Sequence, residues 1–92
     1  MPQKDFTITN KLGIHARPAA QFVKVANTFS CEIRVEKDDD EVDGKSILGL
    51  MMLAAGHGSI ISITAEGEDE DRALEQLGEL ISRDFEEAPA AR

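Results

Sequence analysis

CEIRVEKDDDEV, residues 31–42, is the stretch that decides the fold, because it holds two strands and the turn between them. Its apolar residues Cys31, Ile33 and Val35 alternate with charged residues, the period-two pattern of a strand with one buried face. KDDD at 37–40 is a polar turn, and a short returning strand follows it. A polar face on each strand favours an antiparallel sheet with one side open to solvent.

On both sides of this stretch, segments of strand pattern alternate with segments of helix pattern. Period-two alternation predicts further strands at 6–9 and 60–65. Three helices are predicted by apolar stripes, which are Ala19, Phe22, Val23 and Ala26; Ile47, Leu50, Met51 and Ala54; and Ala73, Leu74, Leu77 and Leu80 or Ile81. The order is strand, helix, strand, strand, helix, strand, helix.

These elements predict an α+β domain in two layers, a four-stranded antiparallel sheet covered on one face by three helices. Residues 1–85 are expected to form this single domain. EEAPAAR, residues 86–92, has no apolar periodicity and is expected to be a disordered tail. The order of the strands within the sheet does not follow from these patterns.

Composition limits the classes of partner. The chain has 92 residues and a formal net charge of −8, from 18 acidic and 10 basic residues, which argues against binding nucleic acid. The single cysteine, Cys31, excludes an internal disulfide and a cysteine zinc site. No stretch approaches the roughly 18 apolar residues of a membrane span, and no secretion signal is visible. We expect a cytoplasmic protein with no membrane insertion.

Three motifs look functional and fail on inspection. DGKS at 43–46 resembles the end of a phosphate-binding loop, but the required earlier glycine is Asp39. An acidic pattern starting at Asp39 resembles a calcium loop, but its twelfth position is Leu50. GHG at 56–58 lacks the third glycine of a dinucleotide fingerprint. We interpret all three as turns or caps, and His57 as a solvated residue.

LGIHARPAA, residues 12–20, places His15 where a helix begins. Gly13 permits a tight turn, and Pro18 suits the first helical turn, where its missing N–H costs nothing. The turn therefore leaves the backbone N–H groups of Ala16 and Arg17 without partners inside the helix. These two groups can bind an anion.

Arg17 adds a cation that can grip a phosphoryl group close to His15. The plain alternative is that His15 is a polar residue that caps the helix. A nucleophile, a cationic clamp and an exposed hinge, with no nearby general base and no carboxylate pair for Mg²⁺, favour covalent phosphoryl transfer over hydrolysis. The group would be received from one protein and passed to another.

LGIHARPAA and GKSILGLMMLAA, residues 44–55, resemble the two signatures of the HPr family, the histidine-containing phosphocarriers of the bacterial phosphoenolpyruvate phosphotransferase system. The resemblance spans roughly residues 4–85 and implies an open-faced β-sandwich. It implies that His15 accepts phosphoryl at Nδ1 from enzyme I and donates it to an enzyme IIA protein. It also implies that Arg17 stabilises the phosphoryl group and Pro18 opens the helix.

The second signature implies two further roles. Ser46 caps the next helix and matches a serine that an HPr kinase/phosphorylase phosphorylates in some members. Ile47, Leu48 and Met51 correspond to a partner-docking patch. We expect a monomer that needs no cofactor and no metal.

Alternatives stay open at this point. MMLAAG and DDDE look weakly like the nitrogen-related branch of the family, so sugar uptake and regulation are not separated. The acidity of the chain is unusual for a surface that docks acidic partners. A second hypothesis is a regulatory protein whose phosphorylation state is read by binding. A third is a small ligand-binding domain of ferredoxin-like shape in which His15 is incidental.

Overall fold

The computed structural model describes residues 2–9 and 13–85, and all statements on structure concern these residues. The elements within them are β1 (Gln3–Thr7), α1 (Ala16–Ala26), β2 (Glu32–Lys37), β3 (Asp40–Asp43), α2 (Ile47–Met52), β4 (Ile60–Glu66) and α3 (Glu70–Ser82). This order confirms the predicted sequence of strands and helices. The predicted tail at 86–92, and residues 10–12 of the predicted turn before His15, lie outside the described residues.

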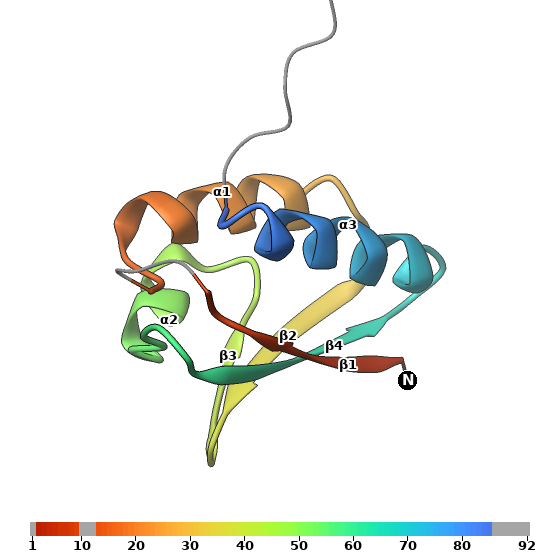
Figure 1. The fold of residues 1–92 in the computed structure, drawn as a ribbon. Helices are drawn as coiled ribbons and strands as arrows, with labels where there is room; N and C mark the ends of the chain where they lie inside the picture. The colour runs from red at the N-terminus through yellow and green to blue at the C-terminus, as the bar shows by residue number, and fades with distance from the viewer. Residues whose placement is uncertain (1, 10–12, 86–92) are drawn as a thin grey trace, which may run out of the picture.

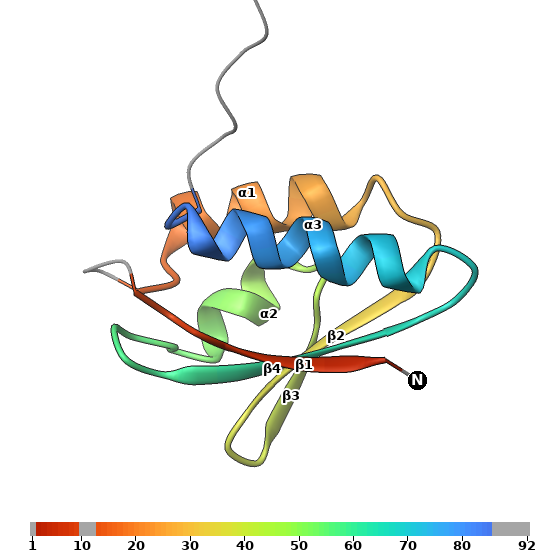
Figure 2. The ribbon, with the colours of Figure 1, turned by 45° about the vertical axis from the view of Figure 1, so that its right-hand side comes forward.

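The four strands form one antiparallel sheet in the order β1-β4-β2-β3. Ile63 of β4 lies opposite Val35 of β2, and Val35 lies opposite Val42 of β3, so their side chains share one face. The three helices lie on that face, and the other face of the sheet is left uncovered (Figures 1 and 2). The predicted architecture is therefore confirmed.

The core lies between the sheet and the helices and is made of aliphatic side chains with a few phenylalanines. Its largest fully buried members are Phe22, Ile8, Ile33, Leu50, Ile61, Ile63, Leu77, Leu80 and Val35. The stripes predicted for α1 and α3 are all buried. No charged or polar side chain is buried among the described residues, so the core needs no internal polar network.

The stripe predicted for the second helix is partly wrong. Leu50 is buried as predicted, but Ile47 and Met51 are 43% and 40% exposed. The helix ends at Met52, earlier than the pattern predicts, and Leu53 is the buried residue that follows. Ala54 has a φ of 53°, so it has left the helix and cannot lie on its stripe.

Ala54 is an exposed residue in the left-handed region, which costs an L-amino acid about 1–2 kcal/mol. We expect Ala54→Gly to raise the free energy of unfolding by up to about 1 kcal/mol, since glycine removes this strain but gains entropy in the unfolded chain. Ala20→Gly, in the exposed part of α1, is the matched control and should lower it by about 1 kcal/mol. Urea unfolding measures the free energy of unfolding of both variants. An Ala54→Gly protein less stable than the parent would contradict the strain assigned to Ala54.

Asp69, just before α3, fastens the loop between α1 and β2. Its two carboxylate oxygens accept hydrogen bonds from the backbone N–H groups of Ser30 (2.9 Å) and Cys31 (3.0 Å). The bond from Ser30, above all, lowers the pKa of the Asp69 carboxyl below its ordinary value of 3.8.

A lowered pKa means that the folded state favours the carboxylate, so Asp69 stabilises the fold above its unfolded pKa. This contribution is lost as the pH falls through the folded pKa. We expect the thermal midpoint of Asp69→Asn to lie below that of the parent at pH 7, and the gap to narrow as the solution is acidified below about pH 4. Thermal melts at a series of pH values measure the gap, and a gap of constant size would contradict the role given to the charge.

Within the described ranges, no helix has the length and apolar character needed to cross a membrane.

Candidate functional site

His15 is the residue at which α1 begins. Its backbone is extended (φ −108°, ψ −165°), and its carbonyl accepts the first helical hydrogen bond from the N–H of Ala19 at 2.9 Å. The imidazole makes no capping hydrogen bond and is exposed. His15 therefore occupies the N-cap position, as the plain alternative supposes, but its side chain does not make the capping hydrogen bond.

The start of α1 leaves hydrogen-bond donors next to the imidazole. In an α-helix the N–H groups of the first residues have no partner inside the helix, and here these residues are Ala16, Arg17 and Pro18. Pro18 has no N–H to leave unsatisfied and is buried, so it fixes the first turn against the core. Two donors remain at the positive end of the helix, on Ala16 and Arg17.

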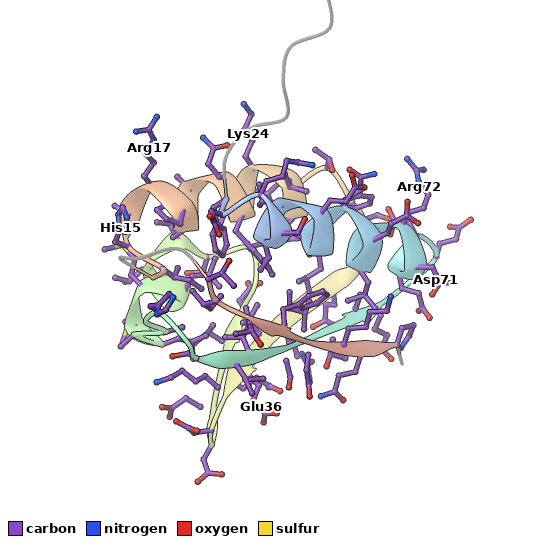
Figure 3. All side chains as sticks on the ribbon, in the orientation of Figure 1. His15, Arg17, Lys24, Glu36, Asp71 and Arg72 are labelled. Atoms are coloured by element: carbon purple, nitrogen blue, oxygen red, sulfur yellow. The ribbon has the colours of Figure 1, made fainter. Side chains whose placement is uncertain are left out.

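Arg17 brings its guanidinium to the same turn as His15. Both residues are exposed, and Figure 3 shows both side chains projecting outward from the start of α1. The structure thus places His15, Ala16, Arg17 and Pro18 in the first turn of α1, with the first three exposed and Pro18 buried. The guanidinium extends into solvent.

Gly13 and Ile14 attach this turn to the loop after α2. The N–H of Ile14 donates to the carbonyl oxygen of Ala55 at 2.8 Å, and Ile14 is buried. Gly13 has a φ of 70°, and a Cβ there would meet the Ala55 carbonyl oxygen and lie 2.6 Å from the Cα of Gly56. This close backbone contact holds the start of α1 beside α2, and the sequence pattern of alternating elements carried no sign of it.

Ser46 caps α2, which confirms its predicted structural role. Its Oγ accepts a hydrogen bond from the N–H of Gly49 at 3.0 Å, and its carbonyl accepts one from Leu50. His57 lies in the exposed turn between α2 and β4.

The solvent-facing side of α2 presents an exposed apolar surface. It consists of Ile47 (43% exposed), Leu48 (68%), Met51 (40%) and Met52 (73%), and we call it the α2 patch. Four large apolar side chains on one short helix are unusual for a surface that stays in water. The sequence prediction named the first three and missed Met52. Its spacing of four residues from Leu48, which places both on one helix face, is the signal that could have found it.

The charges on α1 differ in sign from most of those on the uncovered face of the sheet. Along α1 the charged residues are Arg17 and Lys24, with no acid. The uncovered face of the sheet instead places Glu32 opposite Glu66 and Glu36 opposite Glu41. Figure 3 shows Arg17 and Lys24 pointing away from the sheet and Glu36 pointing from its opposite side. α1 itself therefore carries no acid, although α3 in the same layer begins with Glu70 and Asp71.

Comparison with known proteins identifies the family. The sequence profile described as "PTS HPr component phosphorylation site" matches residues 2–83. The chain belongs to the HPr family. The phosphocarrier protein HPr of Pseudomonas aeruginosa is 52% identical over 88 residues, which cover 95% of this chain and 98% of that protein.

Solved HPr structures share the fold. A crystal structure of HPr-C-His from Thermoanaerobacter tengcongensis has a TM-score of 0.89 at 46% identity, covering 96% of this chain and 100% of the other. A crystal structure of an HPr dimer from the same organism has a TM-score of 0.75, also at 46% identity, covering 95% and 100%. Several relatives are named phosphocarrier protein HPr, which fits a carrier rather than an enzyme.

Proposed function

We propose that this HPr-family protein accepts a phosphoryl group on Nδ1 of His15 from phospho-enzyme I and donates it to an enzyme IIA protein. The observation that carries the proposal is the exposed, non-capping imidazole of His15 at the open N-terminus of α1. In the transfer, the Nδ1 lone pair forms a bond to phosphorus as the bond between phosphorus and the donor breaks. The reverse exchange at the same nitrogen passes the group to the acceptor.

The residues after His15 would stabilise the charge of the phosphoryl group. The N–H groups of Ala16 and Arg17 lie at the positive end of the helix and can donate to phosphoryl oxygens. The Arg17 guanidinium can donate two further hydrogen bonds from the N–H groups along one edge of its plane. Buried Pro18 keeps this turn rigid, so the donors need little reorganisation when the group arrives.

The α2 patch is the surface proposed to dock enzyme I and the enzyme IIA acceptor. Gly13 and Ile14 hold the start of α1 against the loop that follows α2, so a partner seated on the patch reaches His15. Ile47, Leu48 and Met51, which the family resemblance implies, are supplemented by Met52. The absence of acids on α1 fits partners with acidic docking surfaces.

The proposal is tested by incubating the protein with labelled phosphoenolpyruvate, Mg²⁺ and enzyme I. A phosphorylated imidazole is labile in acid and stable in base, so the label should show this stability. No label on the protein would contradict the carrier function. Adding enzyme IIA proteins of the sugar and nitrogen-related branches then shows which one takes the label. Stable label with no onward transfer to any acceptor would favour the alternative, a regulatory protein whose phosphorylation state is read by binding.

Ser46 is proposed as a regulatory site for an HPr kinase/phosphorylase. A phosphate on its Oγ would lie at the N-terminus of α2, where negative charge is tolerated, but beside Ile47 and Leu48 of the α2 patch. We expect Ser46→Asp to raise the KM of enzyme I for this protein by about tenfold, because an added charge must be desolvated on docking. Steady-state kinetics of phosphoryl transfer from enzyme I to the parent and to the variant measure this KM.

Asn27→Asp is the matched control for Ser46→Asp, because it adds the same charge at the far end of α1. Its KM should stay close to that of the parent. A Ser46→Asp protein that accepts phosphoryl as fast as the parent would contradict the regulatory role.

The carrier proposal includes a cytoplasmic location, where phosphoenolpyruvate is available, and a monomeric protein in solution. Light scattering of the purified protein tests the monomeric state directly.

A further inference from the structure

We propose that Met51 and Met52 form a reversible oxidation site, at which a peroxide converts the thioethers to sulfoxides and so switches off partner docking on the α2 patch. This inference rests on the proposed function of that patch. It starts from the two described methionines being neighbours on α2, 40% and 73% exposed. Met51 and Met52 lie outside the core. The large apolar side chains of the described core are aliphatic or aromatic, and peroxide does not attack them.

The chemistry needs only a peroxide as co-reactant. The thioether sulfur attacks one oxygen of hydrogen peroxide, a sulfur–oxygen bond forms, the oxygen–oxygen bond breaks, and water leaves. The sulfur loses two electrons and the peroxide gains them. A thiol-dependent sulfoxide reductase reverses the change, with two thiols oxidised to a disulfide and the oxygen released as water.

The other sulfur described in the structure is protected from this reaction. Cys31 is 2% exposed, and burial, followed by its hydrogen bond with Asp69, raises the pKa of its thiol. The reactive form of cysteine is the thiolate, so a buried thiol with a raised pKa reacts slowly. Peroxide therefore acts first on Met51 and Met52.

The position of the two methionines makes their oxidation matter for docking. With Leu48 they follow the spacing of one helix face, so a partner that buries Leu48 must also bury one or both thioethers. A thioether is apolar and adaptable, whereas a sulfoxide is polar and would be buried without a partner. Loss of the burial of one or two methionine side chains predicts about a tenfold to hundredfold rise in KM for docking.

Oxidation of this site should leave the fold intact. The core side of α2 is formed by Leu50 and Leu53, which are 0% and 3% exposed. Because the sulfoxides would lie on the solvent side, the thermal midpoint should change little. The effect would therefore fall on docking and leave the stability of the protein nearly unchanged.

The experiment treats the whole protein with hydrogen peroxide, removes the peroxide with catalase, and then measures transfer from enzyme I. Mass spectrometry of the peptide containing residues 51 and 52 shows the added oxygen, and thiol titration after unfolding shows whether Cys31 is still reduced. The treated protein should have a KM at least tenfold above its own untreated sample, and a methionine sulfoxide reductase should restore it. The Met51→Leu/Met52→Leu protein, compared with its own untreated sample, should not respond to peroxide.

Each other outcome counts against the inference. An unchanged KM with both sulfoxides present, an equal loss in the double leucine variant, or no recovery after reduction overturns it. Untreated protein that accepts no label at all contradicts the carrier function itself, and the inference falls with it. Untreated protein that accepts label normally and is insensitive to peroxide leaves the carrier function standing.

Discussion

A His15→Ala protein is expected to accept no phosphoryl group from phospho-enzyme I. The imidazole is the proposed nucleophile, and neither the N–H groups of α1 nor the Arg17 guanidinium can form the covalent bond in its place. His15 is exposed and its side chain caps nothing, so the substitution should leave the fold and its thermal midpoint nearly unchanged. Acid-labile label per protein, measured after incubation with labelled phosphoenolpyruvate and enzyme I, should fall to background.

His57→Ala is the matched control, because His57 is also exposed but lies in the turn between α2 and β4. It should accept label as the parent does. If His15→Ala keeps its label and His57→Ala loses it, the phosphoryl group is carried by the wrong histidine for this proposal. If both keep it, His15 is not required for the label, which also contradicts the proposal.

Gly13→Ala should both destabilise the protein and slow phosphoryl acceptance. The φ of 70° costs an alanine about 1–2 kcal/mol, and its Cβ would also overlap the backbone at Ala55 and Gly56. Relief of this overlap requires the start of α1 to move away from the loop, which weakens the bond from Ile14 to Ala55. We expect a loss of about 2 kcal/mol or more in the free energy of unfolding, and a lower rate of transfer because His15 and the α2 patch move apart.

Gly58→Ala separates the effect of backbone strain from the effect of overlap between the added Cβ and the loop. Gly58 also has a positive φ, of 88°, but a Cβ there would meet nothing within 4 Å. The free energy of unfolding of Gly58→Ala should fall by about 1 kcal/mol through backbone strain alone, and its rate of phosphoryl transfer should equal that of the parent. Urea unfolding and transfer kinetics of both variants decide the matter. Equal losses of stability, with transfer unaffected in both, would show that the contact of Gly13 with the loop is unimportant.

The secondary structure was predictable wherever a side-chain pattern was long enough to be read. The stripes of α1 and α3 each extend over several turns, and every residue predicted for their buried faces is buried. In α2 the helix is six residues long, and its end is set by the left-handed turn at Ala54. Two turns give too little periodicity to separate a buried stripe from an exposed patch, so the pattern alone placed Ile47 and Met51 on a buried stripe, whereas the family resemblance placed them in an exposed patch.

The candidate site likewise has one part that the local sequence predicts and another that depends on contacts between distant segments. Residues 15–18 are adjacent in the chain, so the proposed nucleophile, the open helix start and the guanidinium could be placed together from local chemistry alone. The link to α2 depends on Gly13 meeting Ala55 across more than forty residues of chain. The strand order β1-β4-β2-β3 likewise depends on pairing between distant segments, which no local pattern encodes.

The sequence by itself therefore determined which elements form, which faces α1 and α3 bury, and that His15 opens a helix beside a cation. These properties follow from residues within a few positions of one another. Only the tertiary structure decided that the α2 patch, including Met52, lies beside the start of α1, and which acids lie opposite one another on the uncovered face of the sheet. The reason is that each of these depends on how separate elements pack, and packing is a property of the whole chain.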